Sequence, residues 1–257
     1  MQYGDVTSEL IADKIVEAEI IARERGVLAG LEEAMKIFEY LGLKTNSKTR
    51  DGNKLRKEEV ILTIKGSSRK ILQGERLALN FLGRMSGIAT LASEYAVRAK
   101  GARIAGTRKT TPGFRKFEKK AIALGGGDPH RFCLSDAVLI KNNHIAITGL
   151  ENAIRNARKK ASFTKKIEVE VENTEDAIKA ARLGADIIMF DNMKPEEIEK
   201  AIAELKKLGL RNRLVLEASG GVTLANIANY AKTGVDVIST GALTHSSPWL
   251  DISLKIK

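Results

Sequence analysis

The sequence predicts an α/β fold: an α+β, sandwich-like N-terminal domain followed by an incomplete parallel α/β barrel of about six strands. Two observations lead to this. Beyond residue 103, short β-branched segments alternate with amphipathic stretches, a pattern typical of a parallel sheet. The first hundred residues lack this alternation. A chain of 257 residues is long enough to bury a core in both parts.

The second half contains all the predicted barrel strands. They cover residues 103–107, 137–141, 167–171, 187–191, 214–218 and 237–240. The predicted helices cover residues 114–124, 150–161, 174–183, 195–208 and 223–232. Asn173 is a suitable N-cap for the third helix, and Pro195 suits the first turn of the fourth. Six strands are too few for the eight-stranded barrel, so we expect a shortened or open one.

In the first half of the chain we predict two strands, 15–23 and 60–65, and two helices, 31–41 and 68 to about 100. These elements define an N-terminal domain over residues 1–102 and a barrel-like catalytic domain over residues 103–245.

Composition restricts the class of protein. The formal net charge is +11, but the basic residues are spread through helices as well as loops, and aromatic residues make up only 5%. This argues against nucleic acid as a partner, because single-strand binding uses aromatic platforms beside cations. No apolar run approaches the ~20 residues of a membrane span, and the first residues do not resemble a secretion signal. The lone cysteine, Cys133, suits a reducing compartment, and we expect a cytoplasmic protein.

Every predicted barrel strand carries chemically useful residues at or near its carboxyl end. They are Arg108 and Lys109, Lys141, Glu168 and Glu170, Asp191, Ser219 with Gly220 and Gly221, and Gly241. Because the carboxyl ends of parallel strands meet at one edge, we expect a single mouth lined by cations, carboxylates and glycine turns. Gly220 and Gly221 precede a helix predicted to begin near Thr223, which suits a phosphate. Such a mouth fits a phosphorylated substrate.

Two kinds of side chain predict specific roles at this mouth. Glu170 and Asp191 offer the hard oxygen ligands that suit Mg²⁺ bridging phosphates. His130 and Arg131 follow three glycines, on a loop able to bring both to an anion. The spacing of the three histidines matches no zinc motif, and His144 is at least as consistent with a structural role.

Strings of residues in both halves resemble the quinolinate phosphoribosyltransferase family in order and spacing. They are GER at 74–76, ALNFLGRMSGIAT at 78–90, TRKTTPGFR at 107–115, GGGDPHR at 125–131, DAVLIKNNHI at 136–145, EVEVEN at 168–173, FDNM at 190–193, EASGG at 217–221 and TGALTHS at 240–246, with YGDVTS at 3–8. The resemblance covers nearly the whole chain. It implies transfer of a phosphoribosyl group from phosphoribosyl pyrophosphate to quinolinate, with decarboxylation to nicotinate mononucleotide, in NAD biosynthesis.

The resemblance also implies roles for individual residues. The quinolinate carboxylates would be bound by Arg108, His130, Arg131 and Lys141. Lys109 would lie near the reacting phosphoribosyl group, and Glu170 and Asp191 would serve the ribose and Mg²⁺. Phosphate groups would be held by Ser219, Gly220, Gly241 and His245. Arg76 would reach the site of a neighbouring subunit in a homodimer or hexamer of dimers, and residues 246–257 would return to the N-terminal domain.

One position departs from the family pattern. Asn142 stands where an acidic residue is common, which puts a contribution of this position to the metal or pyrophosphate in doubt. Three alternatives stay open: a paralogue of the same fold associated with molybdenum transport, a nicotinate phosphoribosyltransferase, and a basic nucleic-acid-binding protein. The intact TRKTTPG string argues against the first of these.

Overall fold

The structure is a computed structural model that describes residues 5–257, so the first part of the YGDVTS string lies outside the described residues. The chain divides into two compact units. The first contains residues 1–93, 116–126 and 246–257, and the second contains residues 94–115 and 127–245. The division predicted from the sequence placed residues 116–126 in the barrel domain instead. Here Gly125 lies against α3: a Cβ on it would be 2.2 Å from the Ala89 carbonyl oxygen.

The first unit is built on a four-stranded antiparallel sheet in the order β12-β1-β5-β3. Its elements are α1 (Val6–Glu9), β1 (Ile15–Ala22), β2 (Gly26–Val27), α2 (Leu31–Tyr40), β3 (Lys44–Asn46), β4 (Lys54–Leu55), β5 (Val60–Ser67), α3 (Ser68–Arg98), α4 (Arg115–Leu124) and β12 (Ile252–Ile256). The strand β12 pairs antiparallel with β1, from Ala18 opposite Ile256 to Ala22 opposite Ile252. The last strand of the chain therefore completes the sheet that the first strand begins.

Apolar side chains of α2 and α3 cover this sheet and form the core of the first unit. Phe38 of α2 and Leu82 of α3 are fully buried together with Ile20 and Leu62 from the strands. Ala18, Ile20 and Ala22 of β1 share one face of the sheet and are buried beneath the helices, as are Leu62 and Ile64 of β5. On α3, Leu79 and Leu82 face the core, whereas Arg76 is exposed.

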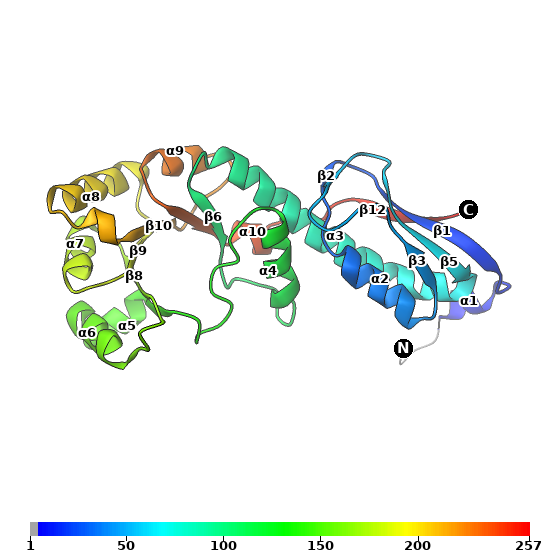
Figure 1. Cartoon of the computed structure of the whole chain (residues 1–257), viewed down its shortest axis with the longest axis horizontal. Helices are drawn as coiled ribbons and strands as arrows, with labels where there is room; N and C mark the ends of the chain where they lie inside the picture. The colour runs from blue at the N-terminus through cyan, green and yellow to red at the C-terminus, as the bar shows by residue number, and fades with distance from the viewer. Residues whose placement is uncertain (1–4) are drawn as a thin grey trace. The chain divides into compact units, whose positions relative to one another are not determined.

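The second unit is built on a six-stranded parallel sheet in the order β6-β11-β10-β9-β8-β7. Its elements are β6 (Arg103–Gly106), β7 (Val138–Ile140), α5 (Asn142–Thr148), α6 (Leu150–Lys160), β8 (Ile167–Val171), α7 (Thr174–Arg182), β9 (Ile187–Asp191), α8 (Pro195–Lys207), the short 3₁₀ helix η1 (Arg211–Arg213), β10 (Val215–Ser219), α9 (Ile227–Lys232), β11 (Val237–Thr240) and α10 (Ala242–His245). The helices α6, α7 and α8 lie side by side along the sheet (Figure 1). Within the described residues β6 and β7 are edge strands that do not pair with each other. The predicted open barrel is confirmed.

Helix ends in this unit follow the signals that the sequence contains. The Asn173 side chain accepts a hydrogen bond from the Asp176 amide and caps α7, and Pro195 opens α8. The expected helix at 223–232 is shorter than predicted, because residues 224–226 form a turn and α9 begins at Ile227. The prediction that the helix begins beside the glycine pair was therefore wrong.

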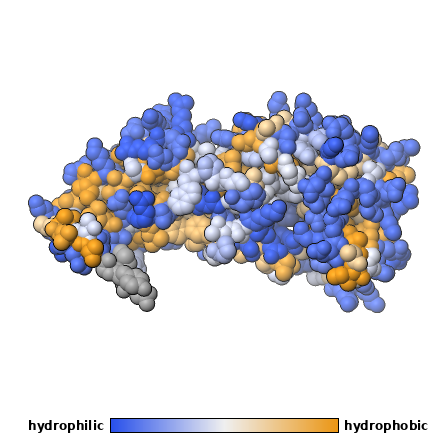
Figure 2. Space-filling model, turned by 180° about the vertical axis from the view of Figure 1, so that it is seen from behind, coloured by the Kyte–Doolittle hydropathy of each residue, from blue (hydrophilic) through white to orange (hydrophobic). Residues whose placement is uncertain are grey.

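The face shown in Figure 2 carries mostly hydrophilic side chains, with apolar areas on both units. Large apolar side chains that are exposed in the first unit include Val6, Leu10, Ile15, Tyr40, Leu77 and Trp249. No helix in the described part of the chain is long and apolar enough to cross a membrane.

Candidate functional site

The carboxyl ends of the six parallel strands carry most of the site residues predicted from the sequence. Arg108 and Lys109 follow β6, Lys141 follows β7, Glu170 lies in β8, Asp191 ends β9, Ser219 and Gly220 lie at the end of β10, and Gly241 follows β11. The parallel register places Asp191 directly opposite Ser219. The sheet thus brings these residues to one edge, as the strand order requires.

Lys109, Gly241 and His245 come together at the ends of β6 and β11. A Cβ on Gly241 would lie 2.9 Å from the His245 Nε2 and 3.0 Å from the Lys109 Cδ. The Thr244 hydroxyl donates a hydrogen bond of 2.6 Å to the Lys109 carbonyl and ties the two segments together. Glycine at position 241 is therefore required by the close approach of the Lys109 and His245 side chains.

Gly220 marks a second close approach, between the ends of β10 and β9. Its φ is +89°, a left-handed conformation that favours glycine. A Cβ on it would lie 2.2 Å from the Asn192 Oδ1 and 2.9 Å from the Asn192 amide nitrogen. The Asn192 amide donates to the Ser219 carbonyl at 2.9 Å. The two strand ends are thus joined beside the predicted phosphate-binding residues.

Arg108 and Arg131 supply two guanidinium groups to the site. The Arg108 Nε is buried and has no hydrogen-bond partner among residues 5–257. Burial lowers the pKa of Arg131, and the nearby positive charge of Arg108 lowers it further, whereas the charge of Glu168 opposes the shift. A buried donor beside a like charge favours the binding of an anion.

Lys141 and Glu170 pair with each other across the ends of β7 and β8. The Lys141 Nζ lies 3.3 Å from the Glu170 Oε1. The Lys141 side chain is half-exposed, whereas Glu170 is buried. His144 accepts a hydrogen bond from the Lys141 amide, which is a structural role.

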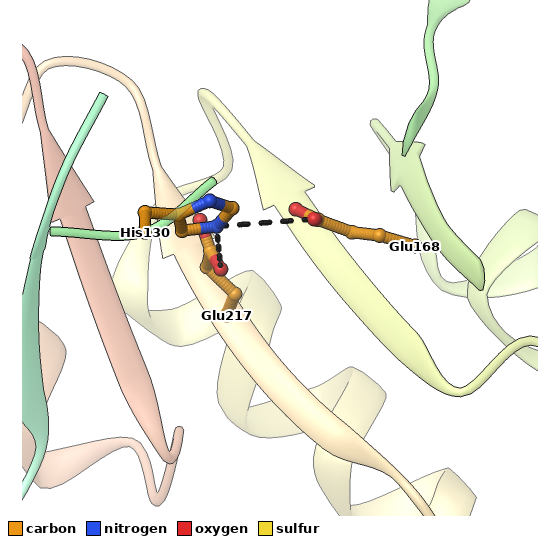
Figure 3. A group of neighbouring side chains, drawn as sticks. All are labelled: His130, Glu168 and Glu217. Carbon is orange, nitrogen blue, oxygen red and sulfur yellow. Dashed lines mark hydrogen bonds and ion pairs between the residues drawn. The ribbon is translucent and has the colours of Figure 1, made fainter. Parts of the chain in front are cut away.

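His130 lies beside two buried carboxylates: Glu168, which the sequence places at the mouth without a specific role, and Glu217, which it does not assign to the site. Its Nε2 is 3.3 Å from the Glu217 Oε2 and 3.8 Å from the Glu168 Oε2 (Figure 3). Burial, followed by the charge of Glu217, raises the pKa of the Glu168 carboxyl to about 7. Neither oxygen of Glu168 has a hydrogen-bond partner among the described residues. The signal for both residues was a glutamate in the middle of an apolar strand, in IEVEV and VLEAS.

Glu170 and Asp191 fit a Mg²⁺ ion by their chemistry and position. Glu170 pairs in register with Met189 and Val171 with Phe190, so Asp191 follows on the neighbouring strand. Carboxylates from adjacent strand ends provide the one or two protein oxygens that Mg²⁺ uses when it also binds phosphates. Asn142 bonds to Glu172 and not to either of these carboxylates.

Arg76 is the one predicted site residue that lies in the first unit, where it is exposed on α3. The sheet of the second unit does not position it. Its prediction as a residue of a shared site stays a prediction.

Cations, carboxylates and glycine turns at the carboxyl edge of an open α/β barrel define an enzyme for a phosphorylated, anionic small molecule. Two family models cover almost all of the chain: quinolinate phosphoribosyl transferase, N-terminal domain, over residues 5–86, and its C-terminal domain over residues 88–255. The chain belongs to the quinolinate phosphoribosyltransferase family and is a phosphoribosyltransferase.

Individual relatives agree with the family assignment. The chain is 49% identical to a probable nicotinate-nucleotide pyrophosphorylase (carboxylating) of Archaeoglobus fulgidus, over 100% of this chain and 99% of that one. It is 42% identical to the human nicotinate-nucleotide pyrophosphorylase (carboxylating), over 93% of this chain and 82% of the human one. The crystal structure of the nicotinate-nucleotide pyrophosphorylase from Ehrlichia chaffeensis has a TM-score of 0.94 and 34% identity, covering 100% of this chain and 93% of that one.

Proposed function

We propose that the chain transfers the phosphoribosyl group of phosphoribosyl pyrophosphate to quinolinate, with loss of carbon dioxide, to give nicotinate mononucleotide and pyrophosphate in NAD biosynthesis. Membership of the family over nearly the whole chain supports this reaction. The observation that carries the site assignment is the pair Arg108 and Arg131, because the Arg108 Nε is a buried donor that no described residue satisfies.

Quinolinate carries two carboxylates, and three cations of the second unit suit them. Arg108 and Arg131 offer planar forks for bidentate binding, and Lys141 offers a point charge. The Lys141 ammonium can turn from Glu170 to a substrate carboxylate, because its side chain is half-exposed. These groups hold the ring so that its nitrogen faces the anomeric carbon of the ribose.

Breaking the bond to pyrophosphate builds positive charge on the ribose and negative charge on the leaving group. Glu170 and Asp191 hold Mg²⁺ and the ribose hydroxyls in this proposal, and a bound Mg²⁺ supplies charge neutralisation of the pyrophosphate. Lys109 lies near the same group and stabilises the departing charge. Glu170 and Asp191 also stabilise the developing positive charge of the ribose.

Phosphate groups of the substrate are held beside Gly220 and Gly241, where two strand ends come close together. Ser219 and Gly220 lie at the end of β10, and Gly241 and His245 lie at the end of β11 beside Lys109. Backbone amides exposed at such turns bind phosphate oxygens without the need for a long helix. The short α9 is not required for this role.

Attack by the ring nitrogen places a positive charge on the pyridine ring. That charge stabilises the ring anion left when the adjacent carboxylate departs as carbon dioxide, and the anion then takes a proton from water. No side-chain nucleophile takes part, and the protein acts by orientation and electrostatics.

The assembly in this proposal is a homodimer or a hexamer of dimers, and the compartment is the cytoplasm. Exposed apolar side chains on the first unit support an interface with another subunit. Arg76 then contributes to the site of the partner chain. Cys133, the single cysteine, suits a reducing compartment.

One assay tests the proposal: formation of nicotinate mononucleotide from quinolinate and phosphoribosyl pyrophosphate, with carbon dioxide measured in parallel and Mg²⁺ varied. We expect product and carbon dioxide in equal amounts and no product without the metal. Nicotinate as an equally good substrate, without carbon dioxide, would contradict the proposal. Tight, steeply salt-dependent binding of nucleic acid would point to another class of protein.

A further inference from the structure

His130 adopts a backbone conformation that few residues other than glycine take. Its φ is +55°, in the left-handed region. The His130 amide donates a hydrogen bond of 2.7 Å to the Asp128 Oδ1. The loop that carries His130 and Arg131 is therefore held by specific bonds.

The two ring nitrogens of His130 have different partners, and these determine where the proton lies. The Arg131 amide donates to the His130 Nδ1 at 2.7 Å. A backbone N–H can only donate, so Nδ1 must offer a lone pair and carry no proton. The single proton of the neutral ring is then on Nε2.

Of the two neighbouring carboxylates, only Glu217 lies within hydrogen-bond distance of the Nε2 proton. Glu217 Oε2 lies at 3.3 Å, whereas Glu168 Oε2, at 3.8 Å, is too far for a hydrogen bond (Figure 3). Glu217 lies in the middle of β10 and is 2% exposed, so the strand fixes its position. Figure 3 shows both carboxylates pointing from their strands toward the imidazole.

A cation is the other occupant that this cluster suggests. One ligand atom each from His130, Glu168 and Glu217 lies within 4.8 Å of the others. An Nε2 that carries the proton has no lone pair for a metal, and Nδ1 is engaged by the Arg131 amide. The hydrogen bonds therefore favour orientation of the ring over metal binding.

We propose that Glu217 is a positioning residue: by accepting from Nε2 it fixes His130 as the neutral ring protonated at that nitrogen, and so sets the loop from which Arg131 reaches the quinolinate site. Glu217 accepts from the His130 ring, and the ring accepts from the Arg131 amide. These two bonds hold the backbone that carries the Arg131 guanidinium. The functional part of this inference rests on the proposed binding of quinolinate by Arg131. The protonation state of the ring does not.

The state of the ring can be measured directly in the full-length protein. With ¹⁵N-labelled histidine, long-range ¹H–¹⁵N spectra distinguish the two neutral forms and the charged form, and three histidines make assignment with His130→Gln simple. We expect His130 near neutral pH to be neutral, with the proton on Nε2. A charged ring, or a proton on Nδ1, would overturn the proposal whether or not the enzyme is active.

Two substitutions of Glu217 then test its effect on the reaction. Glu217→Leu removes the acceptor and replaces a buried carboxylate by an apolar side chain of similar size. We expect the Nε2-protonated form of His130 to be less populated in this variant. The KM for quinolinate should rise roughly tenfold or more, as loss of one such bond predicts, with little change in the KM for phosphoribosyl pyrophosphate. Glu217→Gln keeps an acceptor oxygen and should restore both the ring state and most of the KM.

Glu168→Leu is the matched control for the ring measurement, because Glu168 is equally buried but outside hydrogen-bond distance. It should leave the proton of His130 on Nε2. An unchanged ring and an unchanged KM in Glu217→Leu would overturn the proposal, as would equal losses in the Leu and Gln variants. Should Glu217→Leu fail to fold, the wild-type spectrum and the Gln variant still decide. Wild-type spectra of the expected kind in a protein without quinolinate turnover would instead contradict the proposed function.

Discussion

The Lys141 Nζ lies 3.3 Å from the Glu170 Oε1, so a cation assigned to quinolinate and a carboxylate assigned to Mg²⁺ are partners of each other in this structure. Each ligand would take one member of the pair. We therefore expect binding of the two substrates to be coupled: neutralising Glu170 by a metal makes Lys141 more available to a carboxylate, and the reverse holds by linkage.

Lys141→Ala should lower kcat/KM by roughly ten- to a thousandfold, because a charge-assisted contact in a site is worth a few kcal/mol. The melting temperature should barely change, since a half-exposed ion pair contributes about 0–1 kcal/mol. Steady-state kinetics and calorimetry measure both quantities. Lys207→Ala, which removes a surface lysine 3.7 Å from Glu204, is the control and should keep full activity. Near-normal turnover of Lys141→Ala would exclude the assigned role.

Glu170→Gln and Asp191→Asn should weaken Mg²⁺-dependent binding of phosphoribosyl pyrophosphate more than binding of quinolinate. The amides keep the shape of the side chains but are poor ligands for a hard cation. Titration calorimetry with each substrate separately, with and without Mg²⁺, measures the difference. Equal losses for both substrates, or none, would count against these residues as metal ligands.

Gly220→Ala should destabilise the protein by about 2–4 kcal/mol and weaken phosphate binding, because the new methyl group collides with Asn192 and the backbone is left-handed. The neighbouring Gly221→Ala is a matched control: its φ is +63°, but a Cβ there meets nothing within 4 Å. It should cost only about 1 kcal/mol. Denaturant unfolding compares the two, and equal effects would show that the contact with Asn192 is unimportant.

Glu168→Gln should stabilise the protein at neutral and higher pH. The pKa of the Glu168 carboxyl is raised from its usual 4.5 to about 7, so the folded chain holds a proton that the unfolded chain releases. Stability therefore falls as pH rises between these two values and is constant above them. The advantage of the Gln variant should be small below pH 4.5 and reach at most about 3 kcal/mol above pH 7. Thermal unfolding without added divalent ions tests this, and an advantage that does not vary with pH would contradict the cause.

Arg76→Ala and Lys141→Ala should each be nearly inactive, yet recover activity when their subunits are mixed. If Arg76 acts in the partner's site, a heterodimer has one site with both changes and one intact site. Activity should then approach about half of wild type per heterodimer, by the symmetry of the interface. Subunit exchange is confirmed by native mass spectrometry. Exchange without recovery would place Arg76 in its own chain's site or in none.

The sequence predicts the barrel well because each strand is a short apolar run bounded by turn residues. All six predicted strands differ from the observed ones by at most one residue at each end, and β8, β9 and β11 match at both ends. Short elements such as β2 and β4 were missed, because two residues carry no periodicity. They form through pairing that only the folded chain reveals.

The residues at the ends of the strands can likewise be predicted from the sequence, but the contacts between side chains across the site cannot. Lys141 and Glu170 were each predicted as site residues from their strand ends, and nothing in the sequence showed that they pair. The sequence places Glu217 in a strand and in a family string, but it does not show that His130 lies beside it. That contact depends on the bend of the loop at His130, where φ is +55°. Positive φ is uncommon in any residue except glycine, so propensity does not predict it at one particular histidine.

The pairing of β12 with β1 has a consequence for synthesis of the chain on the ribosome. Ala18 and Ile256 are partners in one sheet, so the first strand emerges long before its neighbour has been translated. The second unit, whose parallel strands lie between them in the chain, is complete in the meantime. The edge of β1 that pairs with β12 therefore stays unpaired through most of translation. During that time its free backbone groups can pair with other nascent chains.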